Sequence, residues 1–350
     1  MPFAAPPVGD LRWRAPQPVK PWKGTRSADH FGPSCMQIPI FAQRYAAPPA
    51  LSEDCLYLNV WTNAKSARER LPVMVWIYGG GLTSGTTSSA WYDGTHLAHK
   101  SVVLVTVAYR VGALGFLVHP ELSAESPNHV SGNYGLLDVI SALEWVQANI
   151  AKFGGDSSRV TILGQSAGGD IVNFLAQSPL AKGLFQRAIS ESCGSGYSGV
   201  PTLRTAQAAS ERFMAKLGAN DIAAARALPA DTLVKAQSGA LPPVIDGYVL
   251  PGNWYELYQT GRLTETPLLL GSNADEGRLF APPAGTPARF EENLRARFGT
   301  YADAILALYP HATDAEAEQA ASDVLRDRNI GWATWQWAFL QSKHGAHSTY

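Results

Sequence analysis

The feature that most constrains this sequence is a glycine-flanked serine set between a buried strand and a helix. Val160–Leu163 is an apolar run typical of a strand buried on both faces, GQSAG follows at Gly164–Gly168, and Ala167–Gln177 has a helical pattern. Glycines on both sides allow a turn so tight that the serine side chain stands clear of the sheet. The free N–H groups at the helix start favour negative charge nearby. The pattern predicts that Ser166 is a nucleophile, and the alternative is a structural turn.

A glycine triplet follows an earlier strand. Val73–Ile77 is a second buried apolar run, and Tyr78 and three glycines come directly after it. Uncovered N–H groups in such a loop, with the N–H of Ala167, suit an oxyanion that forms at the serine. The alternative is a flexible loop. Together with the serine turn, the triplet favours an oxyanion site.

An acidic group is expected after a later strand. Leu268–Gly271 reads as a strand that ends in the polar loop SNADEG. A serine nucleophile needs a base, usually histidine, and that histidine needs a carboxylate. Asp275 and Glu276 both fit the position, and the spacing does not choose between them. The alternative is an ordinary solvated acid at a helix start.

Strands alternate with helices along the chain, which predicts the α/β class with a mostly parallel central sheet flanked by helices. We expect a single domain over residues 1–350 with a helical C-terminal region. A capping box of Thr313 and Glu316 marks one helix start. The other expected strands are Leu71–Tyr78, Ser101–Tyr109, Gln186–Ser190 and Pro267–Leu270, and the expected helical segments are Gly132–Lys152, Leu203–Asp231 and Arg289–Ser342.

Charge and composition narrow the class of partner. The chain has 28 Lys and Arg against 29 Asp and Glu, a net charge of −1, which argues against nucleic-acid binding. Its longest apolar runs, Val73–Tyr78 and Val102–Ala108, are shorter than the roughly 18 residues that span a bilayer. The sequence therefore predicts a globular protein with a small-molecule partner and no membrane span.

Three cysteines allow at most one bridge within the chain. Cys35 and Cys55 bracket a proline-rich stretch with little regular pattern, where a bridge would stabilise the fold and imply an oxidising compartment. The alternative is two reduced thiols. The N-terminus has no basic and apolar segments of the kind that form a secretion signal.

Assembled in order, these motifs resemble the type B carboxylesterase family of α/β-hydrolases, which includes p-nitrobenzyl esterases, fungal lipases and cholinesterases. The resemblance runs nearly end to end. It is carried by PFAAPPVGDLRWRAPQP near the N-terminus, SEDCLYLNVW at Ser52–Trp61, VWIYGGG, VAYRVGALGF at Val107–Phe116, the helical stretch Gly132–Asp156, GQSAGG and GSNADEG.

The resemblance implies a serine carboxylesterase that hydrolyses small-molecule carboxylic esters through an acyl-enzyme, with no cofactor and no metal. It implies a Cys35–Cys55 disulfide and therefore a secreted or periplasmic parent protein. The implied catalytic residues are Ser166 as nucleophile, Glu276 as acid, and Gly80, Gly81 and Ala167 as oxyanion donors.

The histidine base is the missing part of the pattern. Only His311, His344 and His347 follow Glu276, and His311 reads as a solvated loop residue. In the family, the histidine lies in the loop after a strand that would start near Ser348, and relatives also carry a segment before the one that MPFAAPP matches. We therefore expect a chain that is incomplete at both ends. His344 or His347 is the candidate substitute. Without a base, activity is impaired, and the alternative function is a catalytically silent, cholinesterase-like binding module.

Departures from the relatives concern the substrate. Gln165 is neutral where cholinesterases usually carry glutamate, and residues 36–54 contain no tryptophan to stack on a cation. A choline ester is therefore rejected as the preferred substrate. Leu82 and Asp170 also depart from the common pattern, without an assigned effect.

Two other motifs are weighed and set aside. Gly194, Gly196 and Gly199 match a dinucleotide fingerprint, but Pro201 and the late position argue against it. The pairs His96/His99 and His344/His347 have a metal-compatible spacing but no neighbouring carboxylate or cysteine cluster.

Overall fold

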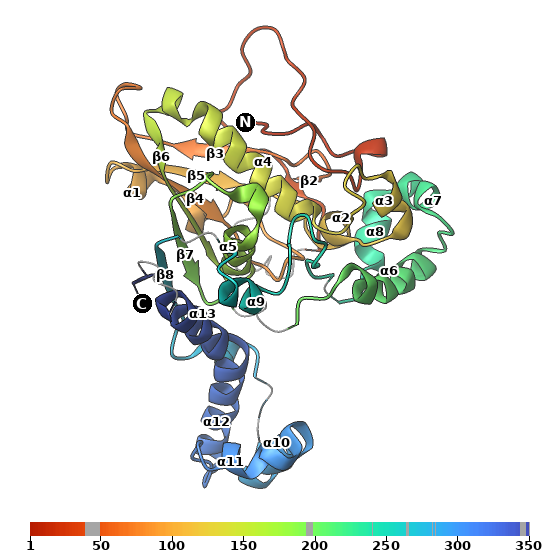
Figure 1. Cartoon of the computed structure of the whole chain (residues 1–350), viewed down its shortest axis with the longest axis vertical. Helices are drawn as coiled ribbons and strands as arrows, with labels where there is room; N and C mark the ends of the chain where they lie inside the picture. The colour runs from red at the N-terminus through yellow and green to blue at the C-terminus, as the bar shows by residue number, and fades with distance from the viewer. Residues whose placement is uncertain are drawn as a thin grey trace.

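The computed structural model describes residues 1–38, 50–193, 199–239, 241–263, 266–281, 283, 285–343 and 348–349. Within these residues the main sheet has seven strands in the order β3-β5-β4-β6-β7-β8-β9 (Figure 1). All neighbours pair in parallel except the edge strand β3, which is antiparallel to β5. The strands are β3 (Leu58–Trp61), β4 (Leu71–Ile77), β5 (Val103–Val107), β6 (Gly155–Gln165), β7 (Arg187–Glu191), β8 (Leu268–Gly271) and β9 (Ser348–Thr349). The predicted α/β class is confirmed.

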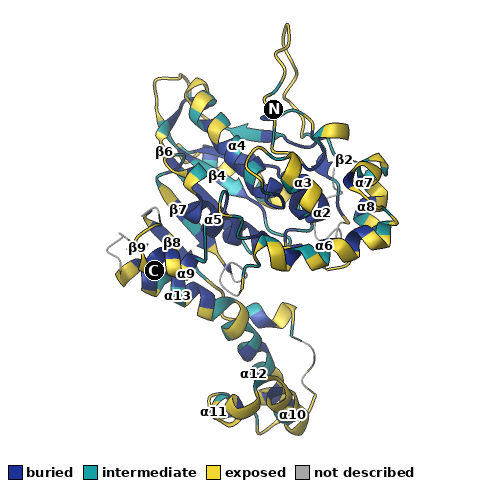
Figure 2. Cartoon of the chain, turned by 45° about the vertical axis from the view of Figure 1, so that its right-hand side comes forward, coloured by how far each residue is buried: buried dark blue, intermediate teal, exposed yellow. Residues whose placement is uncertain are grey.

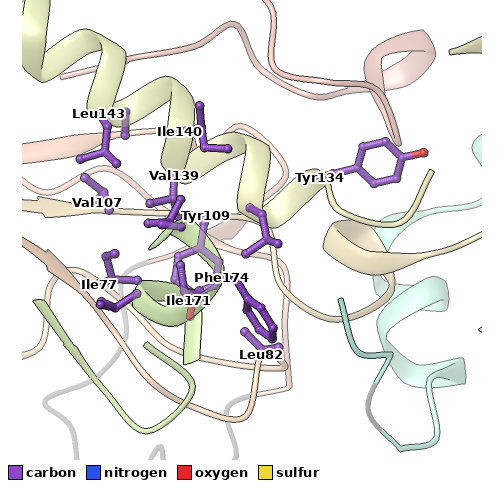
Figure 3. Packing of buried hydrophobic residues seen from close by; sticks show 14 of the residues in the cluster. Ile77, Leu82, Val107, Tyr109, Tyr134, Val139, Ile140, Leu143, Ile171 and Phe174 are labelled. Atoms are coloured by element: carbon purple, nitrogen blue, oxygen red, sulfur yellow. The ribbon is translucent and has the colours of Figure 1, made fainter. Parts of the chain in front are cut away.

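Helices α4 (Tyr134–Asn149) and α5 (Ala167–Gln177) build the main core against this sheet. Figure 3 shows Val139 and Leu143 of α4 directed at the strand residues Val107 and Ile77. All of these side chains are buried. Continuous apolar runs such as β5, whose five residues are all buried, fit a strand covered on both faces.

The sequence analysis did not predict the short strands near the N-terminus. Ser34–Cys35 (β1) and Leu51–Ser52 (β2) pair in parallel as a separate two-stranded sheet, and the Cys35–Cys55 disulfide closes the segment between them. The disulfide is thus present as expected. The antiparallel edge strand β3 was also missed, because its four residues are too few to give a clear pattern.

The segment Leu203–Asp231 is helical as predicted, but it is divided into separate helices. It contains α6 (Leu203–Leu217), α7 (Ile222–Ala227) and the start of α8 (Ala230–Ala236). Gly218 ends α6 in a left-handed conformation with φ of 67°, the usual helix-ending role of glycine. Pro229 separates α7 from α8, since proline cannot continue a preceding helix.

The C-terminal region is helical but divided. Its elements are α10 (Pro287–Phe298), α11 (Ala302–Leu306), α12 (Asp314–Arg326), a π-helical turn (Asp327–Gly331) and α13 (Trp332–Lys343). The predicted capping box at the start of α12 is confirmed, with the Thr313 and Glu316 side chains each bonded to the other's backbone N–H. Figure 2 shows α10, α11 and α12 extending away from the main body, with a small buried core of their own that includes Phe290, Leu294 and Leu306.

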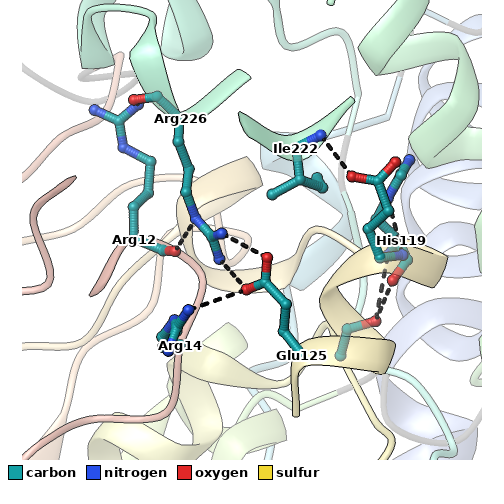
Figure 4. Close-up of polar contacts among 8 residues, drawn as sticks. Arg12, Arg14, His119, Glu125, Ile222 and Arg226 are labelled. Carbon is teal, nitrogen blue, oxygen red and sulfur yellow. Dashed lines mark hydrogen bonds and ion pairs between the residues drawn. The ribbon is translucent and has the colours of Figure 1, made fainter. Parts of the chain in front are cut away.

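The chain segment before the disulfide is tied to helices α3 (Pro120–Glu125) and α7. The Arg226 guanidinium of α7 donates to both oxygens of Glu125 at 2.8 and 2.7 Å and to the carbonyl oxygen of Arg12 at 3.1 Å (Figure 4). The hydrogen bonds from Arg226 lower the pKa of Glu125.

The remaining short helices are α1 (Thr95–Ala98), α2 (Gly112–Phe116) and α9 (Trp254–Gln259). Among the described residues, no helix combines the length and the apolar composition that a bilayer-spanning helix needs.

Candidate active site

The sheet register brings the two glycine-containing loops together. Strands β4 and β6 are parallel neighbours, with Ile77 opposite Gly164, so both end at the same level of the sheet. The glycine triplet leaves β4 and the serine turn leaves β6 at this shared edge. A Cβ atom built on Gly79 would lie 2.5 Å from the carbonyl oxygen of Gln165 and 3.1 Å from the Cβ of Ser166. The two loops are therefore in direct contact, as the sequence predicted.

Ser166 has a strained backbone at the tip of its turn. Its backbone angles, φ of 55° and ψ of −129°, lie in a region that residues other than glycine rarely adopt. Ser166 directly precedes the first residue of α5. Its N–H donates to the carbonyl oxygen of Glu191 at 2.8 Å, and its carbonyl oxygen accepts from the N–H of Asp170 at 3.0 Å. These bonds hold the turn in place.

The flanking glycines are required by close packing. A Cβ on Gly168 would lie 2.1 Å from the carbonyl oxygen of Ile77, and a Cβ on Gly164 would lie 2.4 Å from the carbonyl carbon of Gly168. Real Cβ atoms do not approach this closely. Only glycine at both positions lets α5 start against the end of β4, which is the packing that exposes Ser166.

The glycine loop is itself held in one conformation. Gly80 has φ of 119°, and its carbonyl oxygen accepts from the N–H groups of Thr83 and Ser84, each at 3.1 Å. The carbonyl oxygen of Leu82 accepts from Gly112 at 2.7 Å. The loop that was a candidate oxyanion site is therefore an ordered turn.

A buried tyrosine pair fixes the base of this loop. The rings of Tyr78 and Tyr109 stack with their centroids 4.4 Å apart. The Tyr78 hydroxyl donates to the Tyr109 carbonyl oxygen at 3.0 Å, and the Tyr109 hydroxyl donates to the Tyr78 carbonyl oxygen at 2.7 Å. Burial raises the pKa of Tyr78 above its ordinary value. Both hydroxyls stay protonated and act as structural donors.

A cleft of about 490 Å³ opens above Ser166. Three of the predicted site residues, Ser166, Ala167 and Gly81, line it together. Gly80 lies beside Gly81 in the loop but is not in the lining. The other lining residues are Leu82, Asp170, Phe174, Ser192, Gly199, Val200, Pro201, Pro242, Pro243, Asn329 and Ile330. A second hollow of about 380 Å³ shares Gly81 and is also lined by Gln37, Val111 and Gln237.

Glu276 reaches the cleft through Ser192. The Ser192 hydroxyl, at the end of β7, donates to Oε1 of Glu276, which follows β8, and the same oxygen accepts from the N–H of Asn273 at 2.9 Å. Ser192 lines the cleft and Glu276 lies behind it. Asp275 is exposed and pairs instead with Arg278 at 3.2 Å. Of the two acids that the spacing leaves open, Glu276, which the resemblance implies, is the one hydrogen-bonded to a residue of the cleft lining.

Some of the histidines lie within the described residues, and others lie outside them. His344 and His347, the candidate substitutes for the base, lie outside the described residues. The imidazole Nδ1 of His311 lies 2.7 Å from the carbonyl oxygen of Tyr309, and its ring packs beside Phe290 with centroids 5.3 Å apart, in the α10–α12 region. None of the described histidines lines the cleft.

Several cleft residues were not singled out from the sequence. Asn329 and Ile330 reach the cleft from the π-helical turn between α12 and α13, and Pro242 and Pro243 from a loop before α9. The turn's irregular hydrogen bonding leaves no periodic signal, although π-helical turns are frequent at functional sites. Of the glycine-rich fingerprint, Gly194 and Gly196 lie outside the described residues, Gly199 lines the cleft, and the next helix starts only at Leu203.

The sheet order, the serine turn and the adjoining glycine loop define an α/β-hydrolase fold. The carboxylesterase family model matches residues 1–340, and the chain belongs to that family. The resemblance drawn from the motifs is thereby confirmed.

Named relatives agree with this assignment. The chain is 43% identical to fumonisin B1 esterase of Sphingopyxis macrogoltabida over 341 residues, which cover 93% of this chain and 62% of that protein. It is 38% identical to liver carboxylesterase of Sus scrofa, over 82% of this chain and 55% of the relative. It is 36% identical to para-nitrobenzyl esterase of Bacillus subtilis, over 90% of this chain and 67% of the relative. The chain thus spans roughly three fifths of the length of these relatives.

Proposed function

We propose that this protein is a serine carboxylesterase that hydrolyses small-molecule carboxylic esters through an acyl-enzyme at Ser166. The observation that carries the proposal is the position of Ser166, which lines the cleft from the strained turn between β6 and α5, next to the glycine loop. A serine held this way projects its hydroxyl toward a substrate without moving the scaffold. Family membership supports ester hydrolysis as the reaction class.

In the proposed first step, the Ser166 Oγ attacks the ester carbonyl carbon. The Oγ–C bond forms while the hydroxyl proton passes to a histidine base oriented by Glu276. The carbonyl oxygen becomes an oxyanion, which the N–H groups of Gly80, Gly81 and Ala167 stabilise. The ester C–O bond then breaks, and the alcohol leaves with the proton from the histidine.

In the second step, water attacks the acyl-enzyme under the same base, and the carboxylic acid leaves Ser166. Each oxyanion donor of this kind contributes roughly 3–4 kcal/mol to transition-state stabilisation in a serine hydrolase. An ordered glycine loop supports this role, because fixed donors need no reorganisation during the reaction. His344 and His347 remain the candidates within this chain for the base, and His344→Ala and His347→Ala variants test each of them.

The Ser166 hydroxyl is tested by the Ser166→Ala variant, assayed with p-nitrophenyl butyrate and with a fluorophosphonate probe followed by peptide mapping. We expect hydrolysis and labelling in the wild type, with the label at Ser166, and neither in the variant. Ser101→Ala is the matched control, because Ser101 also has a positive φ, of 59°, but is exposed and outside the cleft. Folded wild-type protein that neither hydrolyses the ester nor takes the label would favour the silent binding module.

We further propose that the protein works in an oxidising compartment, outside the cell or in a periplasm. The Cys35–Cys55 disulfide supports this, because such bonds persist where thiols are not kept reduced.

A further inference from the structure

Four residues of the cleft lining come from two loops that lie side by side. Val200 and Pro201 precede α6, and Pro242 and Pro243 precede α9. We call these four residues the proline wall. Ile245 joins the two loops, because its N–H donates to the Pro201 carbonyl oxygen at 2.8 Å. Both parts of the proline wall therefore belong to one hydrogen-bonded unit.

The proline wall presents carbon atoms to the cleft and has little freedom to change shape. A proline has no N–H to donate, and its ring fixes φ near −65°. The cleft lining also includes the apolar residues Leu82, Phe174 and Ile330. A substrate group that lies against this wall is therefore selected by its size and shape.

A buried amide side chain holds the loop of Pro242 and Pro243 in place. The Asn133 Nδ2 donates to the Val244 carbonyl oxygen at 2.8 Å, and the Asn133 Oδ1 accepts from the Val244 N–H at 3.0 Å. Val244 directly follows Pro243, and both Asn133 and Val244 are buried. The amide thus pairs with both backbone polar groups of Val244, as a neighbouring strand would.

Asp246 completes this arrangement two residues further along. Its Oδ2 accepts from the Asn133 Nδ2 at 2.9 Å. Its Oδ1 accepts from the N–H groups of Tyr248, Val249 and Leu250 at 3.0, 2.8 and 3.0 Å. We call this pair of side chains the Asn133–Asp246 clamp. The clamp determines the path of the chain directly after the proline wall.

Asn133 directly precedes α4, a position where asparagine commonly caps a helix through its side chain. Within the described chain, however, the Asn133 side chain makes no capping hydrogen bond, and its three hydrogen bonds go to the loop instead. Because α4 packs in the main core, the clamp connects the proline wall to the scaffold of the sheet. Asn133 is not among the described residues that line the cleft, so it acts on a substrate only through the wall.

We propose that Asn133 is a positioning residue that fixes the proline wall and thereby selects esters with unbranched acyl and alcohol groups. This inference rests on the proposed esterase function and names the substrate class of the same site. A closely packed wall that is held by hydrogen bonds does not move to admit a branched group, because protein packing responds to even one extra methylene.

Two pairs of esters measure this selectivity. The acyl group differs between p-nitrophenyl butyrate and p-nitrophenyl 2,2-dimethylbutyrate, and the alcohol differs between ethyl butyrate and tert-butyl butyrate. Because branching also slows the chemical step, each ratio of unbranched to branched kcat/KM is compared between variant and wild type. In Asn133→Ala this ratio should fall by about tenfold in at least one pair, the effect that a methylene group has in a tight pocket.

Gln147→Ala is the matched control for a merely structural defect. Gln147 also lies on α4, and its Nε2 donates to the carbonyl oxygens of Ser157 and Leu184 at 2.9 and 2.8 Å. Neither Gln147 nor its two partners is among the described residues that line the cleft. Gln147→Ala should lower the Tm, as Asn133→Ala does, but should keep the wild-type ratios. An unchanged ratio in Asn133→Ala, or an equal change in both variants, overturns the positioning role.

A charge change at the clamp gives a second test in a side chain of the same size. Asn133→Asp loses the donor to Val244 and places two carboxylates together, so the ratio should fall. Adding Asp246→Asn restores an amide between the two side chains and should raise the ratio again. A ratio that does not recover in the double variant contradicts the role of the clamp.

Hydrogen exchange tests the clamp without turnover. In Asn133→Ala the amides of Val244, Val249 and Leu250 should exchange faster than in the wild type, and in Gln147→Ala they should not. Wild-type protection of these amides in Asn133→Ala overturns the inference. If the wild type hydrolyses none of the four esters while exchange responds as expected, the esterase proposal fails and the positioning of the wall by Asn133 stands.

Discussion

At the scale of single residues, the site depends on backbone conformations that most side chains avoid. Ser166 and Gly80 both have positive φ, of 55° and 119°. A strained non-glycine residue costs about 1–3 kcal/mol, and it persists because its neighbours leave no alternative. Here the neighbours are the hydrogen bond from the Ser166 N–H to Glu191 and the contact of Gly79 with the Gln165 carbonyl oxygen.

The neighbouring acids Asp275 and Glu276 allow a sharp test at the scale of single residues. In Glu276→Gln we expect kcat for p-nitrophenyl butyrate to fall roughly 10²- to 10⁴-fold, because an amide does not stabilise a charged histidine. The fold should survive, since Gln also accepts the hydrogen bonds of Ser192 and Asn273 through its oxygen.

Asp275→Asn is the matched control for this prediction. Asp275 precedes Glu276 but is exposed and pairs with Arg278. The activity and Tm of the Asp275→Asn variant should therefore match those of the wild type. Steady-state kinetics with circular dichroism on both variants decide the assignment. Loss of activity in Asp275→Asn with Glu276→Gln unaffected would reverse it.

At the scale of elements, the disulfide supports the glycine loop through one glutamine. Gln37 follows the bridged Cys35 by two residues, and its amide nitrogen donates to the Gly85 carbonyl oxygen at 2.7 Å. The Gly85 N–H donates back to the Gln37 side-chain oxygen, also at 2.7 Å. Ser34 adds a hydrogen bond to Thr86 at 2.7 Å. The small β1–β2 sheet is therefore anchored both to the disulfide and to the end of the glycine loop.

Removing the disulfide should destabilise the protein. For Cys35→Ser/Cys55→Ser we expect the free energy of unfolding to fall by about 3 kcal/mol, since a bridge across a loop of this length restricts the unfolded chain. Denaturant unfolding with and without dithiothreitol measures the effect. The reductant should lower the stability of the wild type and leave the double variant unchanged. Equal stability of oxidised and reduced wild type would contradict the prediction.

At the scale of the whole molecule, the helices α10–α12 form a small unit beside the large one. Their core holds Phe290, Leu294, Leu306, Ala317, Ala320 and Val324, apart from the main core of the sheet. The π-helical turn that follows α12 carries Asn329 and Ile330 to the cleft. The small unit and one wall of the cleft are therefore joined directly along the chain. Cores of such different size should differ in local stability.

Hydrogen exchange of Leu294→Ala tests this division. Leu294 is 4% exposed, and its loss should leave a cavity in the small core. We expect amides of α10–α12 to exchange faster while β4 and β6 keep wild-type protection. Leu143→Ala, in the main core, should instead accelerate exchange in β4 and β6. Uniform acceleration by Leu294→Ala would show that the two cores unfold as one.

The local features of this fold can be predicted from the order of residues alone. Buried apolar runs specify β4, β5 and the end of β6, the start of α5 follows directly from its glycine-serine turn, and the Thr313 box specifies the start of α12. Each of these elements depends on residues that are close in the chain, and such local relations can be recognised from a sequence pattern. Helix breaks at Gly218 and Pro229 use the same local chemistry, but they were masked by the surrounding alanine-rich pattern.

The way in which the separate loops combine depends on long-range packing. The hydrogen bond from the Ser192 hydroxyl to Glu276, and the membership of Asp170, Pro243 and Asn329 in one cleft, depend on strand order and helix packing. These residues come from segments far apart in the chain. Sequence patterns describe which face of an element is buried, whereas the partner that buries it, and the side chains that meet at a sheet edge, are set by long-range packing.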